Sequence, residues 1–425
     1  MKRRIPFKTI FIFILLAGIV FLCTTRPASP RVRGALAHEA YVWQRDWNEA
    51  VRDAVSQHGN SFRELILLNA EVTWKGNTPQ VVRVPIDYAT VKKTYANIGL
   101  ALRIGPYSGN FSSDDSTANF IASLAASLIG QAQSNSIEVA ELQIDFDCAS
   151  SKLDGYRLWV QAIKRKVSPT PVTITALPSW MRLRAFAKLA RSSENYVLQV
   201  HSLERPKDFN APFTLCDPLE AKRAIERAAK IGVPFRVALP TYGYLLAFDS
   251  TGKFLSLSAE GGFKKQPIDA QIREARADPI ELANLIQTWT TNRPALLRGI
   301  IWYRLPTNDD ILNWRWPTLA AMLAARSPKE SFRAETRRVE PGLVEINLVN
   351  DGDLDISSRL VIEVHWPNAR LVASDGLRGF ETSDESPGKI KFQSKAHRLP
   401  AGEKQTIGWL RLSEEREVQV EIKKL

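Results

Sequence analysis

The sequence predicts an α/β protein in which a (β/α)8 barrel is followed by a C-terminal β-sandwich. Three observations support this prediction. Short apolar segments alternate with helical patterns over residues 38–326, the helical patterns stop there, and alternating strand-like segments fill residues 330–425. A chain of 425 residues is long enough for one large domain and one smaller domain.

The first 37 residues form a segment that precedes both domains. Lys2, Arg3, Arg4 and Lys8 come before an apolar run from Ile10 to Cys23, which is the arrangement of an export signal. About 15 apolar residues is short for a membrane-spanning helix. We therefore expect an exported, periplasmic protein whose segment 1–37 is either a cleaved signal peptide with a linker or a retained anchor. In the second case the inner membrane is a partner.

Eight strand candidates are interleaved with helical patterns in residues 38–326, and this alternation matches a (β/α)8 barrel, whose usual size is ~250 residues. An open doubly wound sheet is the alternative, but no Gly-rich phosphate turn follows the first strand. The strand candidates are Tyr41–Arg45, Glu64–Ala70, Ile98–Ile104, Val139–Phe146, Val172–Ala176, Tyr196–His201, Phe235–Leu239 and Gly299–Tyr303. The helical patterns are Trp47–Gln57, Thr117–Gln133, Lys152–Arg165, Arg182–Arg191, Pro218–Ile231 and Pro279–Thr290.

The C-terminal part changes character after Arg326. Ser327 to Glu330 reads as a linker, and the following residues alternate apolar and polar side chains without helical periodicity. A β-sandwich over residues 330–425 is the simplest interpretation. Its strand candidates are Val344–Asn350, Arg359–Val364, Lys389–Gln393, Gln405–Leu412 and Val418–Ile422.

Charge and composition exclude several classes of function. The net charge is +12, but Lys and Arg are dispersed and form no nucleic-acid-binding motif. We therefore expect no nucleic-acid partner. The five histidines are scattered and make no HxH or HExxH pattern. We expect neither a metal site nor a cofactor.

The segment Glu141–Ala149 is the strongest functional signal. Side chains of a strand alternate between its two faces, so Asp145 and Asp147 project together while Ile144 and Phe146 point the other way. Two carboxylates on one side of a buried strand raise the pKa of at least one of them. Function is the preferred explanation; the alternative is that both groups only accept hydrogen bonds from loop amides and Arg side chains.

The other predicted strand ends also carry polar and aromatic residues. The active site of a (β/α)8 barrel lies at these ends. Aromatic faces stack on sugar rings, and carboxylates transfer the protons of glycosidic cleavage. We therefore predict a carbohydrate site, with packing in the core as the alternative for any single aromatic residue. The substrate-binding candidates are Trp43, His201, Tyr242, Tyr244, Trp302 and Arg304, and the carboxylate candidates besides Asp145 and Asp147 are Glu71 and Glu204.

Several of these segments resemble a known family. Ile144–Asp147 resembles the DxD core of the fourth strand of family 18 glycoside hydrolases, the chitinase-like barrels. Lys230–Tyr244 resembles their seventh strand, which ends in Pro-x-Tyr-Gly, and Gly299–Trp302 resembles their eighth, which ends in a Trp below the sugar subsite. The combination of segments 40–45, 145–149 and 213–218 is similar to a bacterial family, domain of unknown function 3142.

The chain also departs from the chitinase-like pattern. The resemblance implies a general-acid Glu two residues after the last Asp and an additional Asp three residues before the middle one. These positions are Ala149 and Leu142. Losing a general acid typically costs ~10²–10⁴-fold in rate, so Glu71 or Glu204 would have to supply the proton.

Two hypotheses for the function follow. In the first, the protein is an exported glycoside hydrolase-like barrel that acts on a polysaccharide or oligosaccharide. Asp147 is then the stabiliser or nucleophile, Asp145 tunes it, and Glu71 or Glu204 is the acid. In the second, it is a catalytically inactive glycan-binding protein derived from such an enzyme. Whether another carboxylate reaches the cleft of Asp145 and Asp147 distinguishes them.

Two of the three cysteines, Cys148 and Cys216, lie outside the N-terminal segment. Both follow strands that end at the same barrel face, and an exported protein meets an oxidising compartment. We predict a disulfide between them, with two buried free thiols as the alternative.

Overall fold

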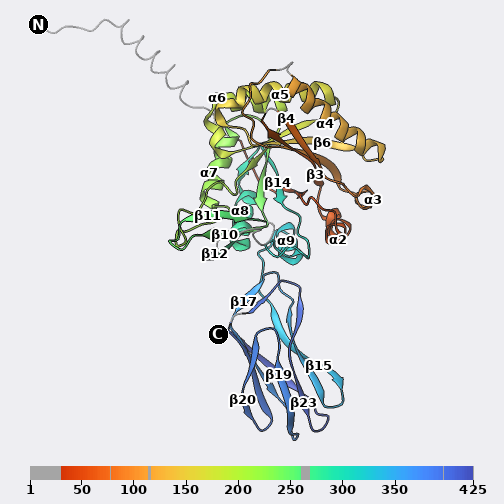
Figure 1. Ribbon diagram of the computed structural model, residues 1–425, viewed down its shortest axis with the longest axis vertical. Coiled ribbons are helices and arrows are strands. Elements are labelled where there is room, and N and C mark those ends of the chain that lie inside the picture. Colours follow the sequence, from red (N-terminus) through yellow and green to blue (C-terminus); the bar gives the residue numbers. More distant parts are fainter. Residues whose placement is uncertain (1–29, 77, 113–115, 260–268, 396, 425) are drawn as a thin grey trace, which may run out of the picture.

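In the computed structural model, which describes residues 30–76, 78–112, 116–259, 269–395 and 397–424, eight parallel strands close into a barrel (Figure 1). Their order is β2-β14-β9-β8-β7-β6-β5-β3, and pairing of β3 with β2 completes the circle. The predicted (β/α)8 barrel is confirmed. The strands are β2 (Ala37–Val42), β3 (Glu64–Lys75), β5 (Asn97–Ile104), β6 (Val139–Phe146), β7 (Val172–Ala176), β8 (Tyr196–Gln199), β9 (Phe235–Pro240) and β14 (Leu297–Tyr303).

The first barrel strand begins four residues earlier than the pattern predicts. His38 and Glu39 are polar, yet both lie in β2, because Trp302 Nε1 donates to His38 Nδ1 at 3.1 Å and Arg236 binds Glu39 at 2.6 Å. The residues before β2 also belong to the barrel, since β1 (Arg31–Val32) pairs with β13 (Arg293–Pro294). Part of the expected linker is therefore packed against the barrel.

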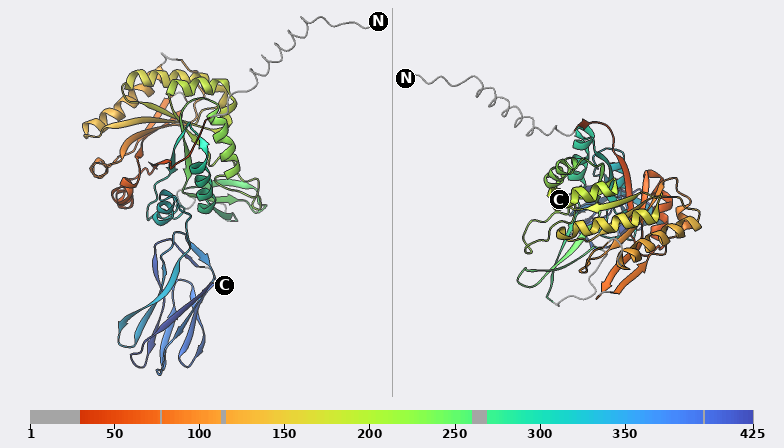
Figure 2. Two further views of the ribbon diagram at one scale, coloured as in Figure 1. Left: turned by 180° about the vertical axis from the view of Figure 1, so that it is seen from behind. Right: turned by 90° about the horizontal axis from the view of Figure 1, so that it is seen from above.

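All six predicted helices are present within a few residues, and they lie outside the strands (Figure 2). Phe146 on the outer side of β6 packs against Tyr156 and Trp159 of α5, as the alternation along this strand predicts. The short helices α3 (Tyr88–Val91) and α9 (Trp316–Leu323) were not predicted. The six predicted helices are α2 (Glu49–His58), α4 (Ser116–Ser134), α5 (Leu153–Val167), α6 (Arg184–Ser193), α7 (Pro218–Ala229) and α8 (Pro279–Thr291).

Two antiparallel additions extend the strand ends. One is a hairpin in which β4 (Thr78–Arg83) pairs with the end of β3. The other is a three-stranded sheet after β9, in the order β11-β10-β12, made of β10 (Gly243–Phe248), β11 (Phe254–Ser258) and β12 (Gln271–Arg276). Neither addition was predicted from the sequence pattern.

The C-terminal part is the predicted β-sandwich, and it lies next to α9 below the barrel (Figure 1). One sheet has the order β15-β16-β23-β19 and the other β20-β21-β18-β24, and β17 pairs with β22. Alternating apolar residues of β16 and β18, such as Ile346, Leu348 and Ile362, form its core. The strands are β15 (Phe332–Glu340), β16 (Leu343–Asn350), β17 (Ile356–Ser358), β18 (Leu360–His365), β19 (Leu371–Gly376), β20 (Phe380–Ser386), β21 (Lys389–Ser394), β22 (His397–Leu399), β23 (Lys404–Leu412) and β24 (Gln419–Lys424).

A buried ionic network fills the barrel interior. Arg236 of β9 binds Glu39 of β2 at 2.6 Å and Glu141 of β6 at 2.7 Å, and all three side chains are buried. Arg63 lies 3.3 Å from the other oxygen of Glu39. Removing the guanidinium from such a network typically costs ~3–5 kcal/mol, because buried carboxylates are left without a counter-charge.

Glu64 is a third buried carboxylate in this network. Burial, together with the charges of Glu141 and Glu39, raises its pKa to about 8. Its Oε1 is buried without a hydrogen-bond partner among the described residues. Because its pKa is about 8, the Glu64 carboxyl is neutral at neutral pH. The charges of Glu39 and Glu141 then balance those of Arg236 and Arg63.

No helix in the described part of the chain is both long enough and apolar enough to cross a membrane.

The raised pKa of Glu64 predicts a pH-dependent stability. The folded pKa is about 8 and the usual value is 4.5, so between these values the folded state holds a proton that the unfolded state has lost. The free energy of unfolding is therefore expected to fall as the pH rises from about 4.5 to about 8, by up to ~1.4 kcal/mol per pH unit. Urea unfolding at a series of pH values measures this slope.

Glu64→Gln is expected to reduce that slope, because Gln resembles the protonated carboxyl. Glu381→Gln is the control, since Glu381 is exposed on the sandwich. Equal slopes for the wild type and Glu64→Gln would contradict the assignment.

Candidate active site

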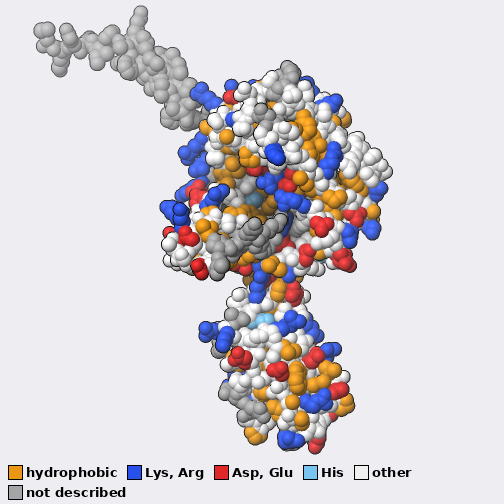
Figure 3. All heavy atoms as spheres, viewed as in Figure 1, with side chains coloured by type: hydrophobic (Ala, Val, Ile, Leu, Met, Phe, Trp, Pro, Cys, Tyr) orange, Lys and Arg blue, Asp and Glu red, His pale blue; other side chains and the backbone are white. Residues whose placement is uncertain are grey.

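A cavity of about 480 Å³ opens at the C-terminal ends of the barrel strands. Its walls come from the strands and from the added sheet β10–β12. In the space-filling view the barrel face is hollowed, and Lys and Arg side chains lie beside the hollow (Figure 3). The residues lining the cavity are Tyr41, Trp43, Arg45, Arg103, Asp145, Asp147, Thr175, Val197, Gln199, His201, Ser202, Ala238, Tyr242, Tyr244, Leu257, Ser258, Ala259 and Tyr303.

Asp145 and Asp147 both line this cavity, but their environments differ. Asp145 is half-buried, and Thr175 Oγ1 donates to its Oδ1 at 2.7 Å. Burial raises the pKa of Asp145, while Thr175 and Arg103 act in the opposite direction. The Asp147 side chain is 49% exposed and lies 3.4 Å from Arg103 Nη2. The strand thus presents one shielded and one open carboxyl group to the same space.

Aromatic side chains form one wall of the cavity. Tyr41 contacts Trp43 edge-on, with ring centroids 5.2 Å apart, and both contact Tyr303. The Tyr242 ring lies 5.5 Å from that of Tyr303. Aromatic surface beside carboxylates is the chemistry that a sugar site needs.

Four of the lining residues form a chain of hydrogen-bonding groups. His201 Nδ1 lies 3.3 Å from Tyr242 Oη, Tyr242 Oη lies 3.1 Å from Tyr244 Oη, and Tyr244 Oη lies 2.5 Å from Ser202 Oγ. Burial lowers the pKa of His201 to about 3. His201 is therefore neutral at neutral pH and holds the tyrosines in place rather than presenting a positive charge.

Neither carboxylate predicted as a replacement acid lines the cavity. Glu204 is exposed and is not among the lining residues. Glu71 is not among the lining residues either; Arg45 holds both of its oxygens at 2.7 and 3.0 Å, and Arg103 lies 3.6 Å away. The contacts with these two arginines engage both carboxylate oxygens of Glu71. Among the described residues, Asp145 and Asp147 are the carboxylates that reach this cavity.

Two substrate-binding candidates lie elsewhere. Trp302 is fully buried on the outer side of β14, where it stacks on His38 at 6.0 Å, so its predicted place in the cavity is wrong. The next residue, Tyr303, points inward instead, because adjacent residues of a strand face opposite sides. Arg304 lines a neighbouring cavity and binds Asp310. The other four candidates, Trp43, His201, Tyr242 and Tyr244, line the main cavity.

Several residues that line the cavity are not among the predicted site residues; they include Arg103, Thr175 and Tyr303. The alternation of side chains along the strands indicates the positions of Arg103 and Tyr303. Arg103 is aligned with Asp145 in the pairing of β5 with β6, and aligned residues of neighbouring parallel strands face the same side. Tyr303 follows Gly299 and Ile301 at a spacing of two, so counting inward positions from the strand register would have identified it.

The predicted disulfide is wrong, because Cys148 and Cys216 are both free and buried. Cys148 Sγ donates to the carbonyl of Ala149 at 3.4 Å. The two cysteines follow β6 and β8, which β7 separates. Cys148 lies close to the end of β6, whereas Cys216 lies at the far end of the loop after β8, directly before Asp217 at the N-terminus of α7. Burial raises the pKa of each thiol to about 12.

The described residues contain no group of three or more His, Cys, Asp or Glu side chains placed to hold a metal ion.

The fold and the site define the class of this protein: it is a closed (β/α)8 barrel with two carboxylates and several aromatic side chains at its C-terminal face. Within it, residues 107–308 match the family model described as Domain of unknown function (DUF3142), so this part of the chain is a domain of that family, as the sequence resemblance indicated. Residues 333–413 of the sandwich match a second model, Domain of unknown function (DUF8456). A comparison with curated proteins gives no significant match.

Solved structures similar to this chain include three enzymes. The spore cortex-lytic enzyme SleL of Bacillus cereus is 13% identical, with 69% of this chain and 75% of that chain covered and a TM-score of 0.47. A chitinase of Chromobacterium violaceum is 14% identical, with coverages of 68% and 98% and a TM-score of 0.44. The family 18 chitinase ChiB of Flavobacterium johnsoniae is 13% identical, with coverages of 69% and 94% and a TM-score of 0.42.

The burial of both thiols predicts their chemical behaviour. Neither Cys148 nor Cys216 is expected to react with iodoacetamide in the native protein at pH 7.5, because each is buried and its pKa is about 12. In urea without reductant both are expected to be alkylated, as peptide mass spectrometry would show. A disulfide-linked pair of peptides containing these residues would contradict the structure.

Proposed function

We propose that the main cavity binds a segment of a polysaccharide, and that glycan binding is the function that its geometry supports best. The observation that carries this proposal is the combination of an aromatic wall with two carboxyl groups of different exposure at the C-terminal face of the barrel. In this wall Tyr303 is half-buried, whereas Tyr41, Trp43 and Tyr242 are buried. Pyranose rings present apolar faces that stack on aromatic rings and hydroxyl groups that donate to carboxylates. The sequence resemblance to chitinase-like barrels supports a carbohydrate ligand.

Hydrolysis is the second candidate function, and the contrast between Asp145 and Asp147 favours it. A glycosidase needs one protonated and one ionised carboxyl group. Burial raises the pKa of Asp145, so it is the group that can hold a proton, whereas Asp147 is exposed and forms an ion pair with Arg103. In this proposal Asp145 is the acid and Asp147 the stabiliser or nucleophile. Glu204 and Glu71 have no part in it, because neither lines the cavity.

We also propose that the protein works outside the cytoplasm. The basic and apolar N-terminal segment supports export to the periplasm, either by cleavage or with retention as an inner-membrane anchor. Residues 1–29 lie outside the described part of the structure. Fractionation of cells, followed by N-terminal sequencing of the mature protein, distinguishes these two fates.

Tyr303→Ala tests the binding proposal. Loss of one aromatic contact is expected to weaken binding ~3–10-fold, in line with the ~0.5–1.5 kcal/mol of an aromatic pair. A glycan array followed by calorimetry with chitin-type and other β-linked oligosaccharides measures the change. Tyr95→Ala is the matched control, because Tyr95 is 93% exposed and is not among the lining residues. A wild-type protein that binds no glycan would refute the proposal.

Asp145→Asn and Asp147→Asn test hydrolysis on a panel of chromogenic glycosides. If the wild type turns over a substrate, each variant is expected to lower kcat ~10²–10⁴-fold, and the wild-type rate is expected to fall as the pH rises through the raised pKa of Asp145. Glu204→Gln is the control, with an unchanged rate expected. Loss of turnover in Glu204→Gln, or full activity in both Asn variants, would contradict the assignment; binding without turnover in the wild type would leave glycan binding as the function.

A further inference from the structure

A second cavity adjoins the main one at the barrel rim. Its volume is about 360 Å³, and Arg45 lines both cavities. The other lining residues come from the loop between β2 and α2, from the first turn of α2 and from the loop between β14 and α9. They are Gln44, Asp46, Asn48, Val51, Arg304, Thr307, Asp309, Asp310 and Ile311. Most of the lining residues are of polar types, and Gln44 Oε1 is a buried acceptor without a hydrogen-bond partner among the described residues.

The loop of residues 304–315, here called the rim loop, is tied to the rest of the barrel. Asn48 Nδ2 donates to Asp309 Oδ2 at 2.8 Å, which joins the two loops across the second cavity. Thr307 Oγ1 donates to the other oxygen of Asp309 at 2.6 Å. Arg304 Nε donates to Asp310 Oδ2 at 3.1 Å. The polar groups around this cavity therefore have defined positions.

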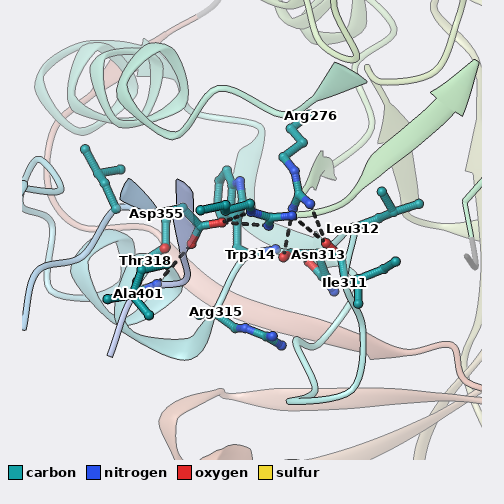
Figure 4. Close-up of polar contacts among 12 residues, drawn as sticks. Arg276, Ile311, Leu312, Asn313, Trp314, Arg315, Thr318, Asp355 and Ala401 are labelled. Atoms are coloured by element: carbon teal, nitrogen blue, oxygen red, sulfur yellow. Dashed lines mark hydrogen bonds and ion pairs between the residues drawn. The ribbon is translucent and has the colours of Figure 1, made fainter. Parts of the chain in front are cut away.

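The C-terminal sandwich holds the rim loop from the other side. Arg398 Nη1 donates to the carbonyl of Ile311 at 3.3 Å, and Asp355 holds Arg398 through its Nη2 at 2.7 Å. Glu403 lies 3.2 Å from Arg315 Nη2. Figure 4 shows Asp355 and Ala401 of the sandwich beside residues 311–315 of the barrel.

Arg315 connects Glu403 of the sandwich with the lining of the second cavity. Its Nη1 donates to the carbonyls of Thr307 and Asn308 at 3.1 and 2.6 Å, and Thr307 lines the second cavity. From the barrel side, Arg276 donates to the carbonyls of Ile311 and Asn313. Side chains of both domains thus meet on the backbone of a single loop.

We propose that the second cavity is a subsite for a further sugar unit of the same glycan, and that the sandwich sets its shape by positioning the rim loop. This inference rests on the proposed glycan binding. The ligand is then a linear oligosaccharide that passes from the Asp147 cavity across Arg45 to the rim loop. A disaccharide occupies the main cavity alone, whereas a longer chain occupies both. Arg398, Asp355 and Glu403 are positioning residues, since they contact the loop or its anchors and not the glycan.

The test compares short and long ligands. Calorimetry measures binding of β-1,4-linked di- and hexasaccharides of N-acetylglucosamine and of glucose. Arg398→Met is expected to weaken hexasaccharide binding about tenfold, the effect of roughly one lost hydrogen bond to a charged group, and to leave disaccharide binding within about twofold. Asp46→Ala, which changes the second cavity directly, is expected to show the same selective loss.

Two further variants separate positioning from general damage. Arg398→Lys keeps a donor for the Ile311 carbonyl and is expected to restore most of the hexasaccharide affinity. Arg411→Met is the matched control, because Arg411 pairs with Glu340 within the sandwich, and both affinities are expected to stay unchanged.

Three outcomes would overturn the inference. Equal effects of Arg398→Met on both ligand lengths, or no effect on either while the wild type binds both, would refute the second subsite alone. A wild type that binds neither ligand length would refute the inference together with the proposed function.

Discussion

The contact of Arg236 with Glu39 and Glu141 holds together three strands of the barrel interior, and the site is built on top of it. Tyr41 Oη donates to Gln143 Oε1 at 2.7 Å in the layer above. Asp145 with Thr175 forms the next layer, and Asp147 opens to solvent. Because charges buried this deeply need excellent geometry to be tolerated, the network sets the relative positions of β2, β6 and β9. The lining residues that these three strands carry, such as Tyr41 and Asp145, are positioned by them.

Strand β6 shows how one alternating pattern gives both stability and chemistry. Its outer residues Leu142, Ile144 and Phe146 are buried against helices, whereas its inner residues are all polar. Glu141 and Gln143 find their partners inside the barrel, where Arg236 binds Glu141 and Tyr41 donates to Gln143. Asp145 and Asp147, the next residue after the strand on the same side, line the cavity, where a ligand can reach them. Access to solvent therefore separates the structural carboxylate Glu141 from the candidate functional carboxylate Asp147.

The sandwich is best understood together with the barrel rim. Its charged side chains meet the backbone of the loop that follows β14, and the same loop carries polar residues of the second cavity. Through Arg398 and Glu403, the sandwich is attached directly to this loop. In the proposed function, this attachment would link the arrangement of the two domains to the length of glycan bound at the rim.

The sequence by itself determined the barrel, its six main helices, the sandwich and the pairing of Asp145 with Asp147. These features follow from local periodicity, because a strand repeats every two residues and a helix every 3.6. The same periodicity also contained the inward position of Tyr303, which the resemblance-based choice of Trp302 missed by one residue.

Only the tertiary structure decided which side chains from different loops meet. It left Glu204 in solvent, enclosed Glu71 between two arginines, and kept Cys148 and Cys216 apart although their loops leave the same barrel face. It also placed Ile311 beneath Arg398. The physical reason is that such distances depend on loop paths and on the spacing of strands around the closed barrel. A sequence pattern specifies neither of these.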